Sequence, residues 1–443
     1  MNSMSEEIVY RRYKPGDESG IVEVMNACFD TFRGYGLNTE VWLDYDRRDP
    51  GFKKEEALVA EHKGRIVGHV QLVFREIKLG RKTFITTGGI ANVSTHPDYR
   101  GKGIATKLMK MALDRCKELK IPLSSLFTGY GYVAHRIYRR LGYADTLFMT
   151  RYLAEDEEVE RTLEMLPEDP SVRVREYREG DEEGMLKVYE QHIEEYTGAI
   201  RRDLTYWKNK LIDIVCYHGF FAENLGEAAR VLIAEKNGKV TGYAYFFIWS
   251  KARKPIIFSK EMGILTELVA SDIKTLASLA KEALKRMREE KVKTFASLVP
   301  PYPPYSDLFR EFQLFRETGI YMDAVVDQSL LFDMLCKEFS ARLEEAGIRS
   351  EFRFLVESPY GRTLLEVKEH EVRVSEGKAD VELRFVDMHS FVRMLYGIEG
   401  FADLLLKGKI DVRRSDVKFQ TLLNTMNALF PRMKWFIWPA DHW

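Results

Sequence analysis

The spacing of hydrophobic and polar residues changes near residue 100, from a strand-like run to a helical repeat. A β-favouring run at 90–95 ends shortly before a Pro, and a short loop with two Gly residues follows. Beyond the loop, apolar residues recur once per helical turn, which is typical of an amphipathic helix. These positions are Ile104, Leu108, Ala112 and Cys116. The pattern predicts a strand, a tight loop and a helix that begins near residue 104.

A strand-like run followed by a helical repeat occurs again in the second half of the chain. A β-rich run at 264–270 leads into Ser271 and Asp272. A helical period then runs through Leu276, Leu279, Ala283 and Met287. The loop between strand and helix here has no Gly pair and no Arg. We therefore expect the same scaffold at both places, with different chemistry.

Two motifs also occur twice. The motif Y-x-x-G-D-E-x-G occupies residues 13–20 and again residues 177–184. Residues 60–68 and 234–242 both have the pattern of a hairpin that turns at Lys-Gly or Asn-Gly. Such self-similarity predicts two units of one fold in tandem.

The pattern changes again near residue 329. Apolar and charged residues alternate in two short stretches, and Asp387 has the pattern of an N-cap for a helix through 391–395. Another helix is expected around 401–405. Strands are expected at 372–374, 381–385 and 434–438. The expected division is a first unit at 1–152, an acidic linker at 153–170, a second unit at 171–328 and an α+β domain at 329–443.

Composition narrows the classes of function. The 443 residues include 67 basic and 68 acidic side chains, a net charge of −1, which argues against nucleic acid as the main partner. No apolar run of 18 residues is present, so no membrane span is expected. The four cysteines are widely spaced singles, which favours a reducing, cytoplasmic location. They are Cys28, Cys116, Cys216 and Cys336.

The loop before the first helix has the chemistry of a pyrophosphate cradle. Gly101 and Gly103 allow backbone amides to approach phosphate oxygens, and the start of the helix adds unpaired N–H groups. Arg100 and Lys102 add cationic donors. The spacing fits neither a nucleotide P-loop nor a Rossmann fingerprint. A tight strand-to-helix turn without a ligand is the alternative. Because the second unit lacks the loop, one cofactor site per chain is expected.

Residues 100–105 fit R/Q-x-x-G-x-G/A, which resembles motif A of the GCN5-related N-acetyltransferases. With the tandem units, residues 137–143, Asp387 and residues 395–400, the whole chain resembles the enhanced-intracellular-survival (Eis) acetyltransferase family. The resemblance implies α/β and α+β classes: tandem acetyltransferase folds, each a mixed twisted sheet flanked by helices, then a sterol-carrier-like α+β domain. It also implies acetyl-coenzyme A as co-substrate, an inert second unit and a hexamer.

The resemblance assigns candidate residues. Those expected to bind acetyl-coenzyme A are Val93, Ser94, Thr95, Arg100, Gly101, Lys102, Gly103, Ile104, Ala105 and Thr106. Val93 and Thr95 would bind the pantetheine arm through their backbones, although ordinary sheet pairing would use the same groups. Tyr138 would be the general acid, with Tyr130, Tyr132 and His135 close by; His135 could instead be a base. Asp30 is a candidate for binding a cationic acceptor.

The base is not on the strand before the cradle, because residues 87–93 contain no carboxylate. In the Eis family the terminal carboxylate of the chain enters the active site, which would assign this role to Trp443. The family usually ends in Phe, so Trp443 departs from it. A solvated chain end is the default alternative. The final nine residues are, however, rich in aromatic side chains, as expected for an anchored tail.

These features predict an N-acetyltransferase that moves an acetyl group directly to a primary amine in a ternary complex. An aminoglycoside-like compound, a polyamine or a lysine could be the acceptor. No metal site is expected, because no His pair has helical spacing. The alternative is a lipid- or sterol-binding protein that uses the acetyltransferase folds as scaffold. In that case the helix at 391–395 would line an apolar tunnel; otherwise it is core.

Overall fold

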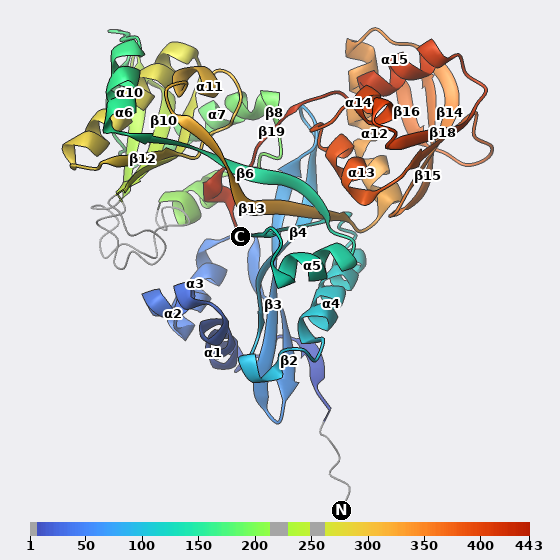
Figure 1. The fold of residues 1–443 in the computed structure, drawn as a ribbon, viewed down its shortest axis with the longest axis horizontal. Helices are drawn as coiled ribbons and strands as arrows, with labels where there is room; N and C mark the ends of the chain where they lie inside the picture. The colour runs from blue at the N-terminus through green and yellow to red at the C-terminus, as the bar shows by residue number, and fades with distance from the viewer. Residues whose placement is uncertain (1–6, 213–228, 249–261) are drawn as a thin grey trace, which may run out of the picture.

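The computed structural model describes residues 7–212, 229–248 and 262–443. In these segments twelve strands form one continuous sheet, ordered β1-β2-β3-β4-β5-β13-β6-β12-β11-β10-β9-β7 (Figure 1). Neighbours are antiparallel except β4 with β5 and β11 with β12. The strands are β1 (Val9–Arg12), β2 (Phe52–His62), β3 (Arg65–Lys78), β4 (Phe84–Thr95), β5 (Leu123–Gly129), β6 (Ala144–Glu155), β7 (Arg173–Glu176), β9 (Ala229–Lys236), β10 (Lys239–Ile248), β11 (Met262–Ala270), β12 (Thr294–Ser297) and β13 (Gln313–Val325).

The two copies of the fold exchange their last strands at the centre of this sheet. β13, from the second copy, lies between β5 and β6, while β6, from the first copy, reaches β12. β6 continues to Glu155, and a helix, α6 (Asp156–Met165), follows at once. The expected boundary at 152 therefore falls inside a strand, and most of the expected linker is regular structure. Local periodicity predicts a strand, but the strand's partner depends on contacts distant in sequence.

Helices cover both faces of the sheet. In the first copy α1, α2 and α3 lie on one face, and α4 and α5 on the other (Figure 1). α4 buries the four predicted apolar positions together with Met109. The mixed sheet flanked by helices confirms the predicted fold class. The bounds are α1 (Glu18–Cys28), α2 (Asp30–Tyr35), α3 (Thr39–Arg48), α4 (Ile104–Glu118), α5 (Val133–Arg140), α7 (Glu182–His192), α8 (Leu204–Tyr206), α10 (Ile273–Glu289) and α11 (Tyr305–Leu308).

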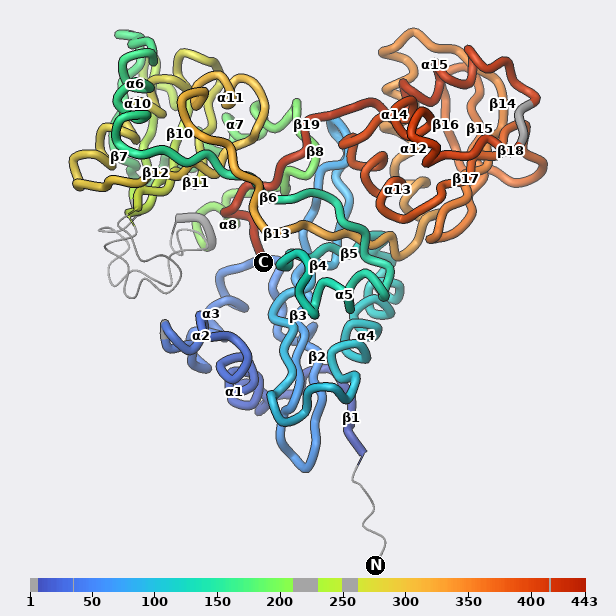
Figure 2. Tube along the Cα trace, viewed as in Figure 1, coloured from blue at the N-terminus to red at the C-terminus, as the bar shows by residue number. Residues whose placement is uncertain are grey.

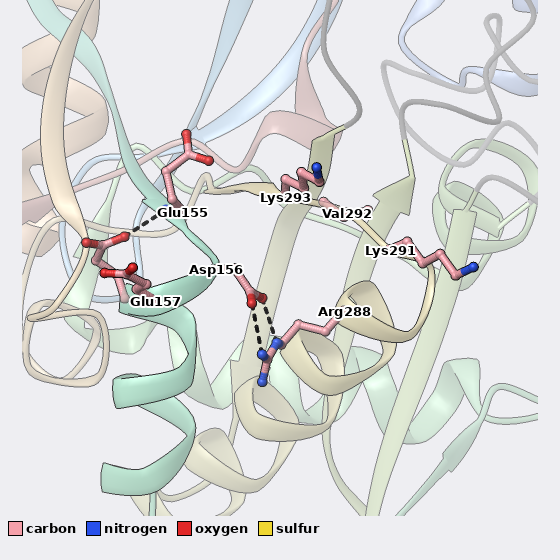
Figure 3. Close-up of a pocket in the computed structure, with 8 residues that line it drawn as sticks. Glu155, Asp156, Glu157, Arg288, Lys291, Val292 and Lys293 are labelled. Atoms are coloured by element: carbon pink, nitrogen blue, oxygen red, sulfur yellow. Dashed lines mark hydrogen bonds and ion pairs between the residues drawn. The ribbon is translucent and has the colours of Figure 1, made fainter.

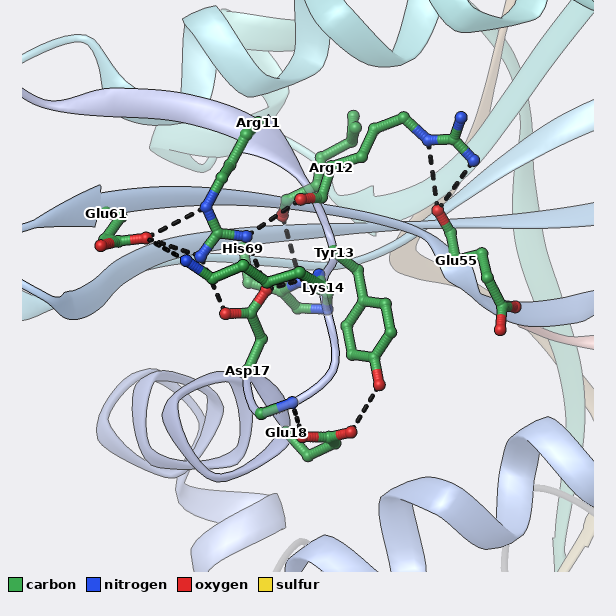
Figure 4. A network of polar contacts seen from close by, with 11 residues as sticks. Arg11, Arg12, Tyr13, Lys14, Asp17, Glu18, Glu55, Glu61 and His69 are labelled. Carbon is green, nitrogen blue, oxygen red and sulfur yellow. Dashed lines mark hydrogen bonds and ion pairs between the residues drawn. The ribbon is translucent and has the colours of Figure 1, made fainter.

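The repeated motif builds the same polar network in both copies. In the first copy Arg11 of β1 binds Asp17 at 2.6 Å and Glu61 of β2 at 2.6 Å, and the hydroxyl of Tyr13 donates to Glu18 (Figure 4). The Tyr177 hydroxyl likewise donates to Glu182 in the second copy. The second ion triad consists of Arg175, Asp181 and Glu235. The sequence repeat therefore corresponds to a repeat of side-chain contacts.

The third part of the chain folds around a five-stranded sheet ordered β16-β15-β14-β17-β18. Asp387 caps its helix as predicted, because its carboxylate accepts from the Ser390 N–H at 2.8 Å. The strands are β14 (Ser350–Ser358), β15 (Gly361–Glu369), β16 (Glu371–Val374), β17 (Val381–Phe385) and β18 (Ile410–Ser415). The helices are α12 (Gln328–Glu345), α13 (Met388–Leu395), α14 (Phe401–Leu406) and α15 (Phe419–Leu429).

The last ten residues leave this domain. Only Lys434–Trp435 of the strand expected at 434–438 is a strand, β19, and it pairs in parallel with β8 (Tyr196–Thr197) of the second copy. Figure 2 follows this tail past β8 to the chain end beside β4. The expected domain 329–443 therefore includes a segment that packs elsewhere. Burial of Phe436 and Trp438 in the core of the second copy is the physical reason.

Two further findings concern the described residues. None of their helices is long and apolar enough to cross a bilayer. Cys28, Cys116 and Cys336 are free thiols, and Cys116 is buried in the core. Cys216 lies outside the described residues.

Candidate active site

An opening between β4 and β5 defines the candidate site. The two strands pair in parallel from Thr87 to Ile90, where Ile90 faces Leu126. A bulge follows in β4 at Asn92, whose φ is 57°, and the register against β3 shifts there. The pairing with β5 ends at Ile90, so the last five residues of β4 present an edge toward the opening. Backbone groups on such an edge can bind an extended ligand.

Two buried hydroxyls at this edge have no hydrogen-bond partner among the described residues. They are Oγ of Ser94 and Oγ1 of Thr95. The Thr95 carbonyl accepts from Sγ of Cys28 at 3.1 Å. Buried polar groups are normally paired, so these two hydroxyls are available to a polar ligand. The amide-rich pantetheine arm of coenzyme A fits this edge.

The loop after β4 leads into α4 with an uncapped helix start. Gly103, the residue before the helix, has φ 76° and no side chain caps the first N–H groups. Gly101 has φ 78°, and a Cβ on either Gly would meet nothing within 4 Å. These glycines are needed for the left-handed backbone and leave open space in front of the amides. The free N–H groups at this helix start can bind an anion.

Cationic side chains surround the same loop. Arg100 and Lys102 are exposed, and Nζ of Lys102 lies 4.7 Å from the centre of the Tyr99 ring. The Tyr99 hydroxyl is in turn 2.9 Å from Nδ1 of His62 on β2. Tyr99 therefore links the loop to the sheet and holds an ammonium group beside the helix start. The residues present fit a pyrophosphate.

The second copy differs at the corresponding place. Asp272 precedes α10, and its carboxylate accepts from the Thr275 N–H at 2.9 Å and from its hydroxyl at 2.8 Å. Lys236 lies 3.1 Å from the same carboxylate. Together these hydrogen bonds outweigh the desolvation of Asp272 and lower its pKa to about 2. A side-chain anion thus occupies the helix start.

Tyr138 lies on α5 and points into the core beside the opening. Its ring packs in the cluster that contains Ile90 and Leu126, and its centre is 6.1 Å from that of Tyr143. Burial raises the pKa of the Tyr138 phenol well above its ordinary value, so the group is protonated at neutral pH.

Trp443, the last residue, reaches the other face of β4. A Cβ on Gly89 would lie 2.8 Å from Cε2 and Nε1 of the Trp443 indole, so the ring rests directly on the strand. A Cβ on Gly88 would collide with Cys116 of α4 on the opposite face. Since successive residues of a strand face opposite sides, Trp443 lies on the face away from α4. Gly89 itself faces Ser125 of β5, next to where the pairing ends.

The structure does not bring every predicted residue to this place. Asp30 is at the start of α2, its side chain is 84% exposed, and it forms an ion pair with Arg33 of the same helix. His135 is buried, and its Nε2 lies 2.8 Å from Asp145 while its Nδ1 accepts from the Gly131 N–H. These contacts engage both ring nitrogens of His135.

The structure also reveals a carboxyl group that the sequence did not indicate. Asp323 of β13 is fully buried and accepts from the hydroxyls of Ser125 at 2.6 Å and Tyr396 at 2.9 Å. Burial raises its pKa. Ser125 faces Gly89, so Asp323 lies one residue away from the strand position covered by Trp443. A single Asp in an apolar strand gives no sequence signal. Asp323 meets Ser125 only because β13 of the second copy pairs with β5 of the first.

Pockets lie elsewhere on the described surface. One of about 700 Å³ is formed where α6 begins and α10 ends, and in it Asp156 pairs with Arg288 at 2.7 Å (Figure 3). Another, of about 210 Å³, opens where the two copies meet and is lined by Arg75, Arg202 and Tyr206 among others. Neither pocket includes a residue of the cradle.

Comparison with known proteins agrees with this geometry. Residues 9–145 match the family model described as an acetyltransferase (GNAT) domain. The chain is an acyltransferase. The match covers the first copy, which contains the cradle and Tyr138. No curated protein matches the sequence of this chain.

Solved structures resemble nearly the whole chain. GCN5-related N-acetyltransferase from Anabaena variabilis has a TM-score of 0.70 and 16% identity, over 99% of this chain and 100% of that one. The enzyme of the same description from Kribbella flavida has a TM-score of 0.69 and 15% identity, over 100% of both chains. Eis1 from Mycobacterium abscessus has a TM-score of 0.63 and 15% identity, over 99% of this chain and 100% of that one. These likenesses show a shared fold across all three parts.

Proposed function

We propose that this acyltransferase moves an acetyl group from acetyl-coenzyme A directly to a primary amine. The observation that carries the proposal is the convergence at the end of the β4/β5 pairing. The cradle follows this point along the chain, Tyr138 approaches from one face, and Trp443 covers Gly89 on the other. The edge of β4 would bind the pantetheine arm, and Arg100 to Thr106 would bind the pyrophosphate.

The terminal carboxylate of Trp443 acts as the base. An α-carboxylate is a weak base, with a pKa of about 3.5, so it works through its position, with a water to carry the proton. Its negative charge also attracts the ammonium form of the acceptor. The ammonium first loses one proton to the water beside this carboxylate. The neutral amine then attacks the thioester carbonyl, and nitrogen loses a second proton as the C–N bond forms.

Tyr138 acts as the acid at the second step. As the C–S bond breaks, the phenol donates its proton to the thiolate. The second proton from nitrogen, carried by water, restores the phenol, and the first is released to solvent. The raised pKa of Tyr138 keeps the phenol protonated until then. Both substrates must be present together, because neither proton transfer uses an acyl-enzyme.

Steady-state kinetics test this order of events. With thiol release as the readout and both substrates varied, a ternary complex gives intersecting reciprocal plots. Parallel plots would indicate an acyl-enzyme and would contradict direct transfer. A panel of aminoglycoside-like compounds, polyamines and lysine peptides would identify the acceptor class.

The lipid-binding alternative needs an apolar tunnel beside α13, but protein side chains pack against the apolar face of this helix. Phe391 of α13 is fully buried, with its ring centre 5.0 Å from Phe385 and 6.1 Å from Phe332. Thermal shift measurements separate the alternatives, since coenzyme A and not a fatty acid or sterol should raise the Tm. The sterol-carrier-like character of the third domain, the hexamer and a cytoplasmic location remain proposals from the resemblance. Light scattering on purified protein tests the hexamer.

A further inference from the structure

The tail that carries Trp443 is fastened to the second copy. The Phe436 N–H donates to the Thr197 carbonyl at 2.8 Å, just after the two-residue strand β19. Trp438 is fully buried, and its ring centre lies 5.8 Å from Tyr189 and 5.4 Å from Tyr196. Chain ends fray unless tertiary contacts hold them. Here the contacts come from the copy that lacks the cradle.

A buried ion triad fixes the tail two residues before its end. Arg202 donates to both oxygens of Asp441, from Nε at 3.0 Å and from Nη2 at 2.9 Å. The same guanidinium donates to both oxygens of Glu267, at 2.6 and 2.9 Å. The side chains of all three are 0% exposed. The hydroxyl of Tyr206 also donates to Asp441 at 3.0 Å.

This ion triad restricts the position of the Trp443 carboxylate. Two carboxylates around one guanidinium in the core are unfavourable unless the geometry is well defined, because each charge loses its hydration. The planar guanidinium of Arg202 fixes the directions in which the carboxylates of Asp441 and Glu267 approach it. Its Cζ lies 4.0 Å from the Tyr189 ring centre. Two residues span at most about 7 Å, so fixing Asp441 confines the terminal carboxylate to a small volume beside β4.

Glu267 lies on β11, which precedes α10 as β4 precedes α4. The first copy has no carboxylate on the corresponding stretch at 87–93, whereas the second copy has one and uses it to hold Arg202. We propose that Arg202 and Glu267 are positioning residues that, through Asp441, place the Trp443 carboxylate in the active site of the first copy. The inference rests on the proposed function. It gives the copy without a cradle a role in catalysis.

Asp441→Asn in the full chain tests the inference. It keeps the side-chain shape and removes the charge that Arg202 binds. We expect kcat to fall by about tenfold to a hundredfold, because displacement of a reacting group by about 1 Å has effects of this size. The KM for acetyl-coenzyme A should stay within about twofold, since the cradle is untouched. Carboxypeptidase should release Trp443 about tenfold faster or more, because the tail opens more often.

The chain offers a matched control. Asp181→Asn removes one carboxylate from the triad of Arg175, Asp181 and Glu235, which has the same composition but lies away from the tail. This variant should leave kcat and the release of Trp443 unchanged at equal folded fraction. If Asp441→Asn does not fold, Tyr206→Phe removes one hydrogen bond from Asp441 and should show the same changes in smaller measure.

Removal of Trp443 separates the two proposals. If that truncation abolishes activity while Asp441→Asn leaves both kcat and carboxypeptidase release unchanged, the positioning role is wrong and the terminal base stands. If the truncated protein is fully active, the terminal base itself is wrong. Equal loss of kcat in Asp441→Asn and Asp181→Asn would also overturn the positioning role, since it would reflect stability alone.

Discussion

The two copies of the fold differ most at the start of one helix. α4 begins after Gly103 with free N–H groups and with Arg100 and Lys102 in front of it. α10 begins at Asp272, whose own carboxylate accepts from the helix N–H groups. A helix start attracts negative charge in either case. The comparison shows that one side chain decides whether this charge comes from a ligand or from the protein.

A second difference lies on the strands that lead to these helices. β4 has no carboxylate at 87–93, and Gly89 leaves room for Trp443. β11 carries Glu267, which binds Arg202 and so helps to hold the tail. The first copy thus has the features of a binding site, and the second those of an anchor. The following predictions test this division, from the largest expected effect to the smallest.

Adding one Gly after Trp443 moves the terminal carboxylate away from the position proposed for the base. We expect kcat to fall by about a hundredfold or more, the usual contribution of a positioned acid or base. The Tm should change little, because Asp441 and Trp438 keep their contacts. One Gly added at the other end of the chain is the control. Full activity in the extended protein would remove the carboxylate from the mechanism.

Tyr138→Phe removes the proposed acid and keeps the ring in the core. We expect kcat to fall by about a hundredfold, while the KM for acetyl-coenzyme A changes by less than about twofold. Tyr130→Phe, at an exposed neighbour with a side chain of the same kind, should keep wild-type turnover. Steady-state assays of thiol release measure both variants. Unchanged turnover in Tyr138→Phe would exclude this phenol as the acid.

Lys102→Glu and Lys274→Glu make the same charge reversal in front of the two helices. The first should raise the Kd for coenzyme A by about tenfold or more, because it replaces a charge-assisted contact with repulsion of phosphate. Lys274 lies in the first turn of α10, where the cradle is missing, and its reversal should leave the Kd unchanged. Calorimetric titration measures both. Equal weakening would mean that the two helix starts are not different.

Asp272→Ala removes the cap of α10 and should destabilise the protein by about 1 kcal/mol at pH 7. Since the pKa of Asp272 is lowered to about 2 from 3.8, its contribution is complete above the unfolded value and is lost as pH falls toward 2. The difference in free energy of unfolding between wild type and variant should therefore shrink at pH 3. Urea unfolding at both pH values measures it. A difference that grows at low pH would have the wrong sign.

Local features of the site were predictable from sequence, and long-range ones were not. The left-handed glycines, the apolar face of α4 and the Asp387 cap depend on residues close together in the chain, so periodicity and residue type indicate them. The repeated motif likewise predicted a second copy, and the loop beginning at Ser271, which has no Gly pair and no Arg, predicted that this copy has no cradle. Each of these features needs only neighbours within a few turns or one hairpin.

The exchange of β6 and β13 and the route of the tail depend on pairings across hundreds of residues. The alternation in a strand does not say which edge it will join, so Asp323 and its contact with Ser125 had no sequence signal. Arg202 and Asp441 are 239 positions apart and come together only in the folded core. Asp30 stays a prediction: it lies at the exposed start of α2 and is paired with Arg33 of the same helix.

The number of coenzyme A molecules bound per chain tests the central claim most directly. Isothermal titration calorimetry of the full chain should give one site for wild type, and Lys102→Glu should weaken that single site while Lys274→Glu leaves it intact. Two sites per chain, or a site that responds to Lys274→Glu and not to Lys102→Glu, would contradict the division of the two copies into a binding unit and an anchoring unit.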